Sequence, residues 1–110
     1  MLSLKKCLTD IANFMGISNN SLRVGKILIQ WGTSSKTVAA HDADRNTITF
    51  AQSYSQIPVV FAQSTSATNF VNLYMCGVSA VSTTQFFMTF QNTYTSSYMI
   101  TGNWLAIGVA

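Results

Sequence analysis

The sequence predicts an all-β fold, an antiparallel β-sandwich preceded by one short helix. The chain has 110 residues, which suits a single domain with a single core. From Val24 onward it consists of short β-branched and aromatic runs divided by Ser, Thr, Asn and Gly, with no second stretch of helical period. Before that point apolar residues recur at helical spacing. We therefore divide the chain into a helix over residues 1–16 and a sandwich over residues 24–110.

The expected helix has an apolar seam. Its apolar residues are Met1, Leu4, Leu8, Ile11 and Met15. They are spaced alternately by three and four residues, as at the a and d positions of two heptads. Two heptads are too short to form a stable coiled coil alone. The helix must either pack on its own domain or continue an upstream stalk, and the turn-rich residues from Gly16 to Ser21 end it.

The β region divides into eight candidate strands. They are residues 26–31, 36–40, 46–51, 58–64, 71–78, 85–91, 98–101 and 104–109. Alternation predicts that Ile48 and Phe50 share a core face, as do Phe86, Met88 and Phe90. We also expect Trp31 and Trp104, each with apolar neighbours, to lie in the core.

Two strands do not alternate. Residues 59–62 and 104–107 are apolar on both faces, so a partner sheet must cover one face and a partner chain is a candidate for the other.

The scarcity of charge is the most unusual feature of the composition. Charged residues make up 8% of the chain, against about 25% in an average soluble domain. A chain so apolar would expose adhesive surface as a monomer, so we expect an oligomer. The longest apolar run, residues 57–62, is far shorter than the roughly 18 residues of a membrane-spanning helix. The first six residues do not resemble a secretory signal, so we expect neither a signal peptide nor a transmembrane segment.

The sequence argues against an enzyme and against nucleic-acid binding. Glutamate is absent, and only His41 and three aspartates, Asp10, Asp42 and Asp44, could serve acid–base chemistry. No nucleophile elbow, phosphate loop or dinucleotide fingerprint occurs. The six Lys and Arg residues form no basic stripe. The two cysteines, Cys7 and Cys76, lack metal-ligand or redox spacing and are expected to be free thiols.

One polar cluster, residues 41–46, stands out. Asp42 and Asp44 could present two carboxylates to a hard cation, with His41 and Arg45 beside them, but the further oxygen ligands of a calcium loop do not follow. A solvated hairpin turn is the plain interpretation. We expect no cofactor and no metal site, and two alternatives stay open: a cation or sugar contact at Asp42 and Asp44, or a cation on a threefold axis.

Sugar binding requires aromatic faces and hydrogen-bonding groups, and this chain has both in its expected loops. The candidate aromatic residues are Tyr54, Phe70, Tyr94 and Tyr98, with Asn69 as an amide partner. Packing at the edge of the sandwich is the alternative role for each ring.

Four segments read together resemble a known family. They are Ile27-Leu-Ile-Gln-Trp-Gly32, Ile48-Thr-Phe-Ala-Gln-Ser-Tyr54, Ile57-Pro-Val-Val-Phe61 and Trp104-Leu-Ala-Ile-Gly108. Their order and spacing from about Val24 to Ala110 resemble the gp53-like C-terminal tip domain of phage tail fibres, related in fold to H-type lectins. The chain departs from that pattern at Ala51, where the family usually has proline, and at Val109, where an aromatic or polar residue is commoner.

The resemblance implies a sandwich of about six strands, assembled as a parallel homotrimer at the tip of a virion fibre. It gives Leu4, Leu8, Ile11 and Met15 a role in a trimeric stalk that continues an upstream fibre segment. It implies adhesion to a glycan or protein receptor on the host cell. The matching motifs are strand and corner residues, so they carry no ligand contacts across.

Three functions follow as hypotheses. The first is a receptor-binding adhesin that recognises host-surface carbohydrate through its loops. The second is a structural trimerisation or capping module without a ligand. The third is a free H-type-like lectin. The expected stalk-like helix and the lack of an expected signal peptide argue against it.

Overall fold

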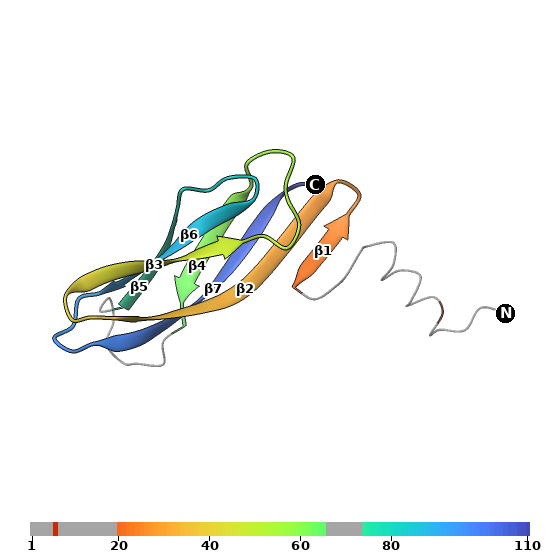
Figure 1. The fold of residues 1–110 in the computed structure, drawn as a ribbon. Coiled ribbons are helices and arrows are strands. Elements are labelled where there is room, and N and C mark those ends of the chain that lie inside the picture. The colour runs from red at the N-terminus through yellow and green to blue at the C-terminus, as the bar shows by residue number, and fades with distance from the viewer. Residues whose placement is uncertain (1–5, 7–19, 66–73) are drawn as a thin grey trace.

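The computed structural model describes residue 6, residues 20–65 and residues 74–110, and these residues form a sandwich of two antiparallel sheets (Figure 1). Its strands are β1 (Ser21–Val24), β2 (Ile27–Val38), β3 (Asp42–Thr49), β4 (Val59–Ser64), β5 (Tyr74–Ser79), β6 (Gln85–Asn92) and β7 (Tyr98–Val109). The expected all-β sandwich is confirmed. Apart from Lys6, the expected helix and its seam lie outside the described residues. None of the described residues belongs to a helix that is long and apolar enough to span a membrane.

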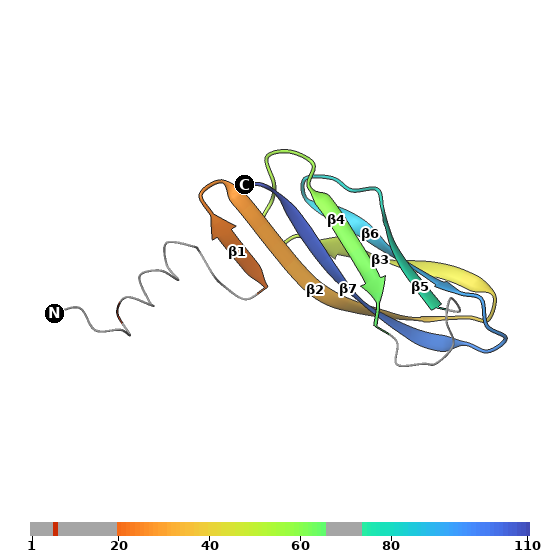
Figure 2. The same ribbon diagram turned by 180° about the vertical axis from the view of Figure 1, so that it is seen from behind.

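The longest strand pair lies at the centre of the four-stranded sheet. β2 and β7 pair antiparallel from Ile27 opposite Val109 to Val38 opposite Tyr98. β1 flanks β2 and β4 flanks β7, which gives the order β1-β2-β7-β4. The second sheet has the order β3-β6-β5 and packs against one face of the first, as the view from behind shows (Figure 2). The opposite face of the four-stranded sheet has no layer over it among the described residues.

The structure corrects several expected strand boundaries. Residues 26–31 and 36–40 belong to one strand, β2, and residues 98–101 and 104–109 belong to one strand, β7. Residues 42–46, interpreted as a turn, lie in β3, and β1 begins three residues before the expected start of the sandwich.

Glycine explains the false breaks in β2 and β7. A Cβ on Gly32 would lie 2.7 Å from the Trp104 indole nitrogen, and one on Gly102 would lie 2.6 Å from both Cys76 Sγ and the Met88 methyl carbon. These glycines make room for core side chains inside continuous strands and do not mark turns.

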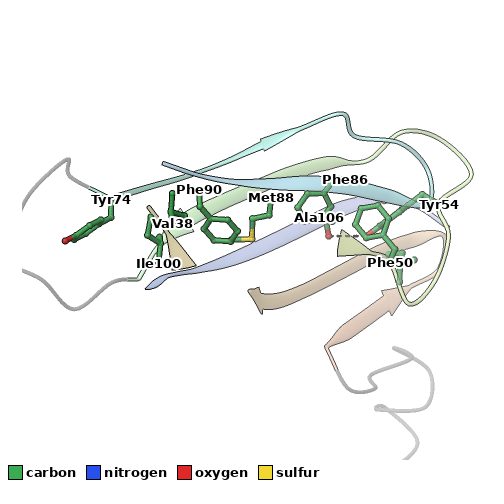
Figure 3. Packing of buried hydrophobic residues seen from close by; sticks show 10 residues of the cluster. Val38, Phe50, Tyr54, Tyr74, Phe86, Met88, Phe90, Ile100 and Ala106 are labelled. Carbon is green, nitrogen blue, oxygen red and sulfur yellow. Dashed lines mark hydrogen bonds between the residues drawn. The ribbon is translucent and has the colours of Figure 1, made fainter. Parts of the chain in front are cut away.

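The core lies between the two sheets and extends along the length of the sandwich (Figure 3). Phe86, Met88 and Phe90 of β6 are fully buried, which confirms the alternation expected for that strand. Phe50 is buried beside them, with its ring centroid 5.6 Å from that of Phe86, and Ile48 packs against the cluster. Trp104 packs partly buried against Phe86, at 5.3 Å between centroids.

The expectation for Trp31 is wrong. It is 37% exposed, because it follows Gln30 in β2 and therefore points to the other face of the sheet. That face carries no covering layer among the described residues.

One buried amide fixes the connection between the sheets. Gln30 is 1% exposed; its Nε2 donates to the Gln52 carbonyl oxygen at 2.9 Å, and its Oε1 accepts from the Gln52 backbone nitrogen at 3.1 Å. This pair of bonds holds the segment between β3 and β4 against β2. It places Tyr54 beneath β7, where Gly108 leaves space for the ring.

We predict that Gln30→Met lowers the free energy of unfolding by about 1–3 kcal/mol, because it keeps side-chain volume but removes both bonds to Gln52. Urea denaturation followed by circular dichroism measures this. The matched control Gln91→Met, at an exposed position of β6, should change stability by less than about 0.5 kcal/mol. Equal effects of the two substitutions would contradict the role of Gln30.

Candidate functional site

The sandwich has two ends that differ in what they carry. β1 and β7 both run toward one end, where the turn from β1 to β2 lies and Ala110 donates its backbone N–H to the Lys26 carbonyl oxygen at 2.7 Å. We call this the proximal end. The turn between β2 and β3 and the loop between β6 and β7 lie at the other, distal end (Figure 1). Several residues that the sequence proposed as ligand contacts lie there.

His41 and Asp42 lie at a shallow recess of the distal end. The recess has a volume of about 380 Å³ and also includes Asn92 and Thr93. His41 adopts a left-handed backbone conformation with φ of 54°, and its backbone N–H donates to the Tyr94 carbonyl oxygen at 3.1 Å. The turn before β3 is therefore joined to the loop after β6. Asp42 has its side chain exposed beside this junction, with Oδ1 accepting from the Ala43 backbone nitrogen at 2.8 Å.

Three tyrosines form a cluster at the same end. The rings of Tyr74 and Tyr98 stack with centroids 4.2 Å apart, and Tyr94 meets Tyr74 edge-on at 6.5 Å. Tyr74 is the buried member, and its hydroxyl points away from the rest of the core (Figure 3). Tyr94 and Tyr98 are half-buried, so each leaves part of its ring open to solvent.

A buried amide also fixes the distal end. Asn92 is 1% exposed, and its Nδ2 donates to the carbonyl oxygens of Val38 at 3.0 Å and Ser96 at 2.9 Å. Its Oδ1 accepts from the Tyr94 backbone nitrogen at 2.8 Å. One side chain thus joins the end of β2 to both sides of the loop that carries Tyr94.

The other proposed contacts do not gather at this end. Asp44 points toward β2, with Oδ2 3.7 Å from the Lys36 ammonium nitrogen. Arg45 points to the outer face of the three-stranded sheet, where its guanidinium lies 4.1 Å from the centre of the Phe87 ring. Because neighbouring residues of β3 face opposite ways, Asp44 and Arg45 cannot share a site. No group of three His, Cys, Asp or Glu side chains suited to a metal ion occurs within the described ranges.

Tyr54 requires a correction. It is 4% exposed, its ring lies 5.1 Å from that of Phe50, and its hydroxyl donates to the Ala106 carbonyl oxygen at 3.3 Å. The residue packs in the core at the proximal end and presents no face to a ligand. The loop position made it look exposed, but the Gln30 bonds turn the segment inward. Asn69 and Phe70 lie outside the described residues.

The outer face of the four-stranded sheet carries none of the ligand contacts proposed from the sequence, although residues 59–62 and 104–107 were expected to be apolar on both faces. Its exposed apolar side chains include Ile27 and Trp31 of β2, Val59 and Phe61 of β4, and Leu105 and Ile107 of β7. Between them lies a groove of about 860 Å³, lined on one side by Trp31, Phe61 and Leu105 and on the other by Thr33, Gln63 and Asn103. The sequence signal for this face was the absence of polar residues from both faces of residues 59–62 and 104–107.

Burial changes the acidity of three groups. Loss of solvent raises the pKa of the Cys76 thiol to about 11, from 9.0. Burial also raises the pKa of Tyr54, against a smaller lowering effect of its hydrogen bond with Gln30. The pKa of Tyr74 is raised by desolvation and then by the neighbouring Tyr98 and Tyr94 hydroxyls. All three groups therefore stay neutral at physiological pH.

Comparisons with known proteins identify a family and several solved structures of similar fold. A family model described as "putative tail fiber protein gp53-like, C-terminal" matches residues 23–109. The structure of an N-truncated R1-type pyocin tail fibre aligns with 98% of this chain and 98% of its own, at 13% identity and a TM-score of 0.57. A search of curated proteins found no significant match.

Two longer fibres from P. aeruginosa also align. The R1 pyocin fibre matches 74% of this chain at 15% identity and a TM-score of 0.57, and the R2 pyocin fibre matches 74% at 23% identity and a TM-score of 0.52. This chain covers 23% and 21% of those two fibre chains, respectively. At such low identity the likeness is one of fold.

We predict that Asn92→Ala lowers the free energy of unfolding by about 2–3 kcal/mol, because it leaves three backbone groups without their partner. Thermal and urea denaturation measure the loss. Gln91→Ala, at the exposed neighbouring position, serves as the control and should have an effect below about 0.5 kcal/mol. A stable Asn92→Ala protein would show that water replaces the amide at little cost.

The Cys76 thiol should be slow to alkylate. A pKa of about 11 in place of 9.0 leaves about one hundredth as much thiolate at pH 8, and the thiolate is the nucleophile. In a Cys7→Ser variant, the iodoacetamide rate should rise about tenfold per pH unit up to about pH 11. The contribution of this thiol to the free energy of unfolding is constant at pH values below 9.0, the pKa of the unfolded thiol. It falls as the pH rises from there toward about 11, because the thiol ionises at lower pH in the unfolded chain than in the folded protein. A rate that levels off near pH 9 would contradict this environment.

Proposed function

Because this chain belongs to the family of gp53-like tail fibre C-terminal domains, we propose that it is the tip of a phage or phage-derived tail fibre that binds carbohydrate on the host-cell surface. It is then a component of the virion tail, joined to an upstream fibre segment. The proposal is a binding role without catalysis and without a cofactor.

The observation that carries the proposal is the gathering of His41, Asp42, Tyr94 and Tyr98 at the distal end. These residues come from two separate parts of the chain, and the His41–Tyr94 backbone bond brings the parts together. The end that they occupy is the one farthest from β1, where the chain enters the sandwich (Figure 1). A fibre tip meets a cell with the end that points away from its stalk.

The side chains at this end suit a saccharide. A partly exposed tyrosine ring can pack on the C–H face of a pyranose, while carboxylate, imidazole and amide groups bond its hydroxyls. Tyr98 is held by its stack on buried Tyr74, and Tyr94 is held through its backbone by Asn92. Rings fixed before binding lose little entropy when the ligand arrives. The left-handed conformation of His41 adds a backbone constraint of the kind that clusters at binding sites.

A homotrimer would multiply weak contacts. A single recess of about 380 Å³ holds one or two sugar rings and gives modest affinity. Three copies on one fibre raise the effective concentration at a cell surface, and the combined affinity exceeds that of one site by orders of magnitude.

A structural capping module is the second candidate. The uncharged outer face of the four-stranded sheet favours it, since such a face can serve assembly without any receptor. A well-folded trimer that binds no member of a broad bacterial glycan array and no host cell would support this alternative over the adhesin.

The test of the adhesin is binding to an array of bacterial surface glycans and to host cells by the assembled protein. We expect wild type to bind, and Asp42→Asn and Tyr98→Ala to reduce binding at least about tenfold, the effect of losing about 1.4 kcal/mol per site. Each removes one hydrogen-bonding or stacking group at the distal end.

The control variant is Thr47→Ala, which lies on the outer face of the three-stranded sheet. It should bind like wild type. Because Tyr98 also contacts the core, circular dichroism must show that the Tyr98→Ala protein is folded, whereas exposed Asp42 tests the site without that risk. Unchanged binding by both distal variants would exclude the distal end as the receptor site.

A further inference from the structure

The outer face of the four-stranded sheet is a continuous apolar surface. Strand register places Leu22, Ile29, Ile107 and Val59 in one row across all four strands. Trp31, Leu105 and Phe61 form the next row toward the distal end. Val24, Ile27 and Val109 form the row on the proximal side. Phe61 is 61% exposed and Ile27 51% exposed, so much of this surface meets solvent in the single chain.

No charged side chain points outward from this sheet among the described residues. Beyond the three apolar rows, the same face continues with hydroxyl and amide groups: Thr33, Asn103 and Gln63, then Ser35 and Thr101. Two of these pairs already bond across the strands, Thr33 to Asn103 and Ser35 to Thr101, each at 2.8 Å. The outer face of the other sheet differs, since it carries Arg45 and is mostly polar.

We propose that this face is where copies of the chain pack against one another, around the axis of the trimer. The inference rests on the homotrimer of the proposed function and names the surface that forms it. Sheet axes parallel to the fibre would put the proximal ends together near the stalk and leave the three distal ends pointing outward.

Self-complementarity favours a second copy over other occupants. In a symmetric assembly equivalent rows can meet at the same level, so aliphatic side chains pack on aliphatic side chains. Hydroxyl and amide groups both donate and accept, so the polar rows can bond to their own copies. A row of charges could not do this without repulsion. Interface cores are depleted of charge in the same way.

The size of the face fits an interface between subunits. At about 4.8 Å between strands and about 6.8 Å between rows, the ten residues of the three apolar rows cover about 330 Å² of flat area. The polar rows extend it toward the roughly 800 Å² that one partner contributes to a stable interface. Trp31 and Phe61, which flank the groove, are of the aromatic type that anchors interfaces.

A saccharide or a membrane fits this face less well. A sugar could use only the groove, where Thr33, Gln63 and Asn103 lie beside the two aromatic rings. The row of Leu22, Ile29, Ile107 and Val59 and the proximal row offer neither a ring nor a hydrogen-bonding side chain, so a sugar would leave them uncovered. Binding to an anionic membrane surface calls for lysine or arginine on the contact face, and there is none among the outward side chains described here.

Sedimentation equilibrium of the full chain tests the proposal. We expect wild type to be a trimer at micromolar concentration, and Ile107→Lys, at the centre of the face, to associate at least about a hundredfold more weakly, the effect of a few kcal/mol lost at an interface core. Gln91→Lys, at an exposed position of the central strand of the other sheet, is the matched control and should remain a trimer. A trimeric Ile107→Lys protein or a monomeric wild type would overturn the proposal.

A second measurement does not depend on the lysine variant folding. In a Cys7→Ser background, where the remaining Cys76 thiol has a pKa raised to about 11 and reacts slowly, Val59→Cys and Thr47→Cys each add one thiol. The two added thiols lie on the outer faces of the two sheets, both at exposed positions of the single chain. Maleimide should react at position 59 at least about tenfold more slowly than at position 47, because access limits the reaction in the assembly. Equal rates would show that the face is open and overturn the inference.

The two proposals fail separately. A trimer with a protected position 59 that binds no glycan or cell leaves the interface intact and removes the receptor role. If the trimer binds cells but reacts equally at positions 59 and 47, the outer face is not the subunit interface, because the copies must then be held together elsewhere. Quenching of Trp31 fluorescence by free saccharides in a monomeric wild type would assign the groove to a ligand and overturn the inference.

Discussion

The pairing of β2 with β7 is the constraint on which the rest of the structure depends. These are the longest strands, each 12 residues, and they pair along their whole length. Each presents one face to the core and one face outward, so their register determines both the buried layer and the open surface. β1 and β4 add to their edges, and the three-stranded sheet packs beneath them. A shift of one residue would exchange the two faces.

Two buried amides, one at each end, attach the loops to this strand pair. Gln30 joins β2 to the segment before β4, and Asn92 joins the end of β2 to the loop before β7. A buried amide that meets backbone groups on both its oxygen and its nitrogen fixes position and direction together. The family motif is explained in the same terms, since Gly32 accommodates Trp104 and Gly108 accommodates Tyr54. These motif residues build the scaffold and lie outside the distal loops.

The two ends and the two outer faces of the sandwich suit a fibre tip in different ways. The distal end carries tyrosine rings and polar groups held in place before any ligand binds. The outer face of the four-stranded sheet carries apolar rows without charge. A small domain with 8% charged residues can remain in solution if that face is covered by other copies. The scarcity of charge in the sequence thus corresponds to the uncharged outer face of this sheet.

The sequence by itself determined the fold class, the buried row of β6 and the family, because alternation and motif spacing are local properties of the chain. Only the tertiary structure decided where Trp31 and Tyr54 point. Trp31 lies between Gln30 and Gly32 in a strand whose other nearby residues are apolar. Which face it occupies follows from the pairing of β2 with β7 and from the packing of the second sheet. Tyr54 lies in a polar segment, and the bond between distant Gln30 and Gln52 turns it inward. The meeting of His41 with Tyr94 likewise depends on hydrogen bonds between residues far apart in the chain, so only the tertiary structure assembles the candidate site.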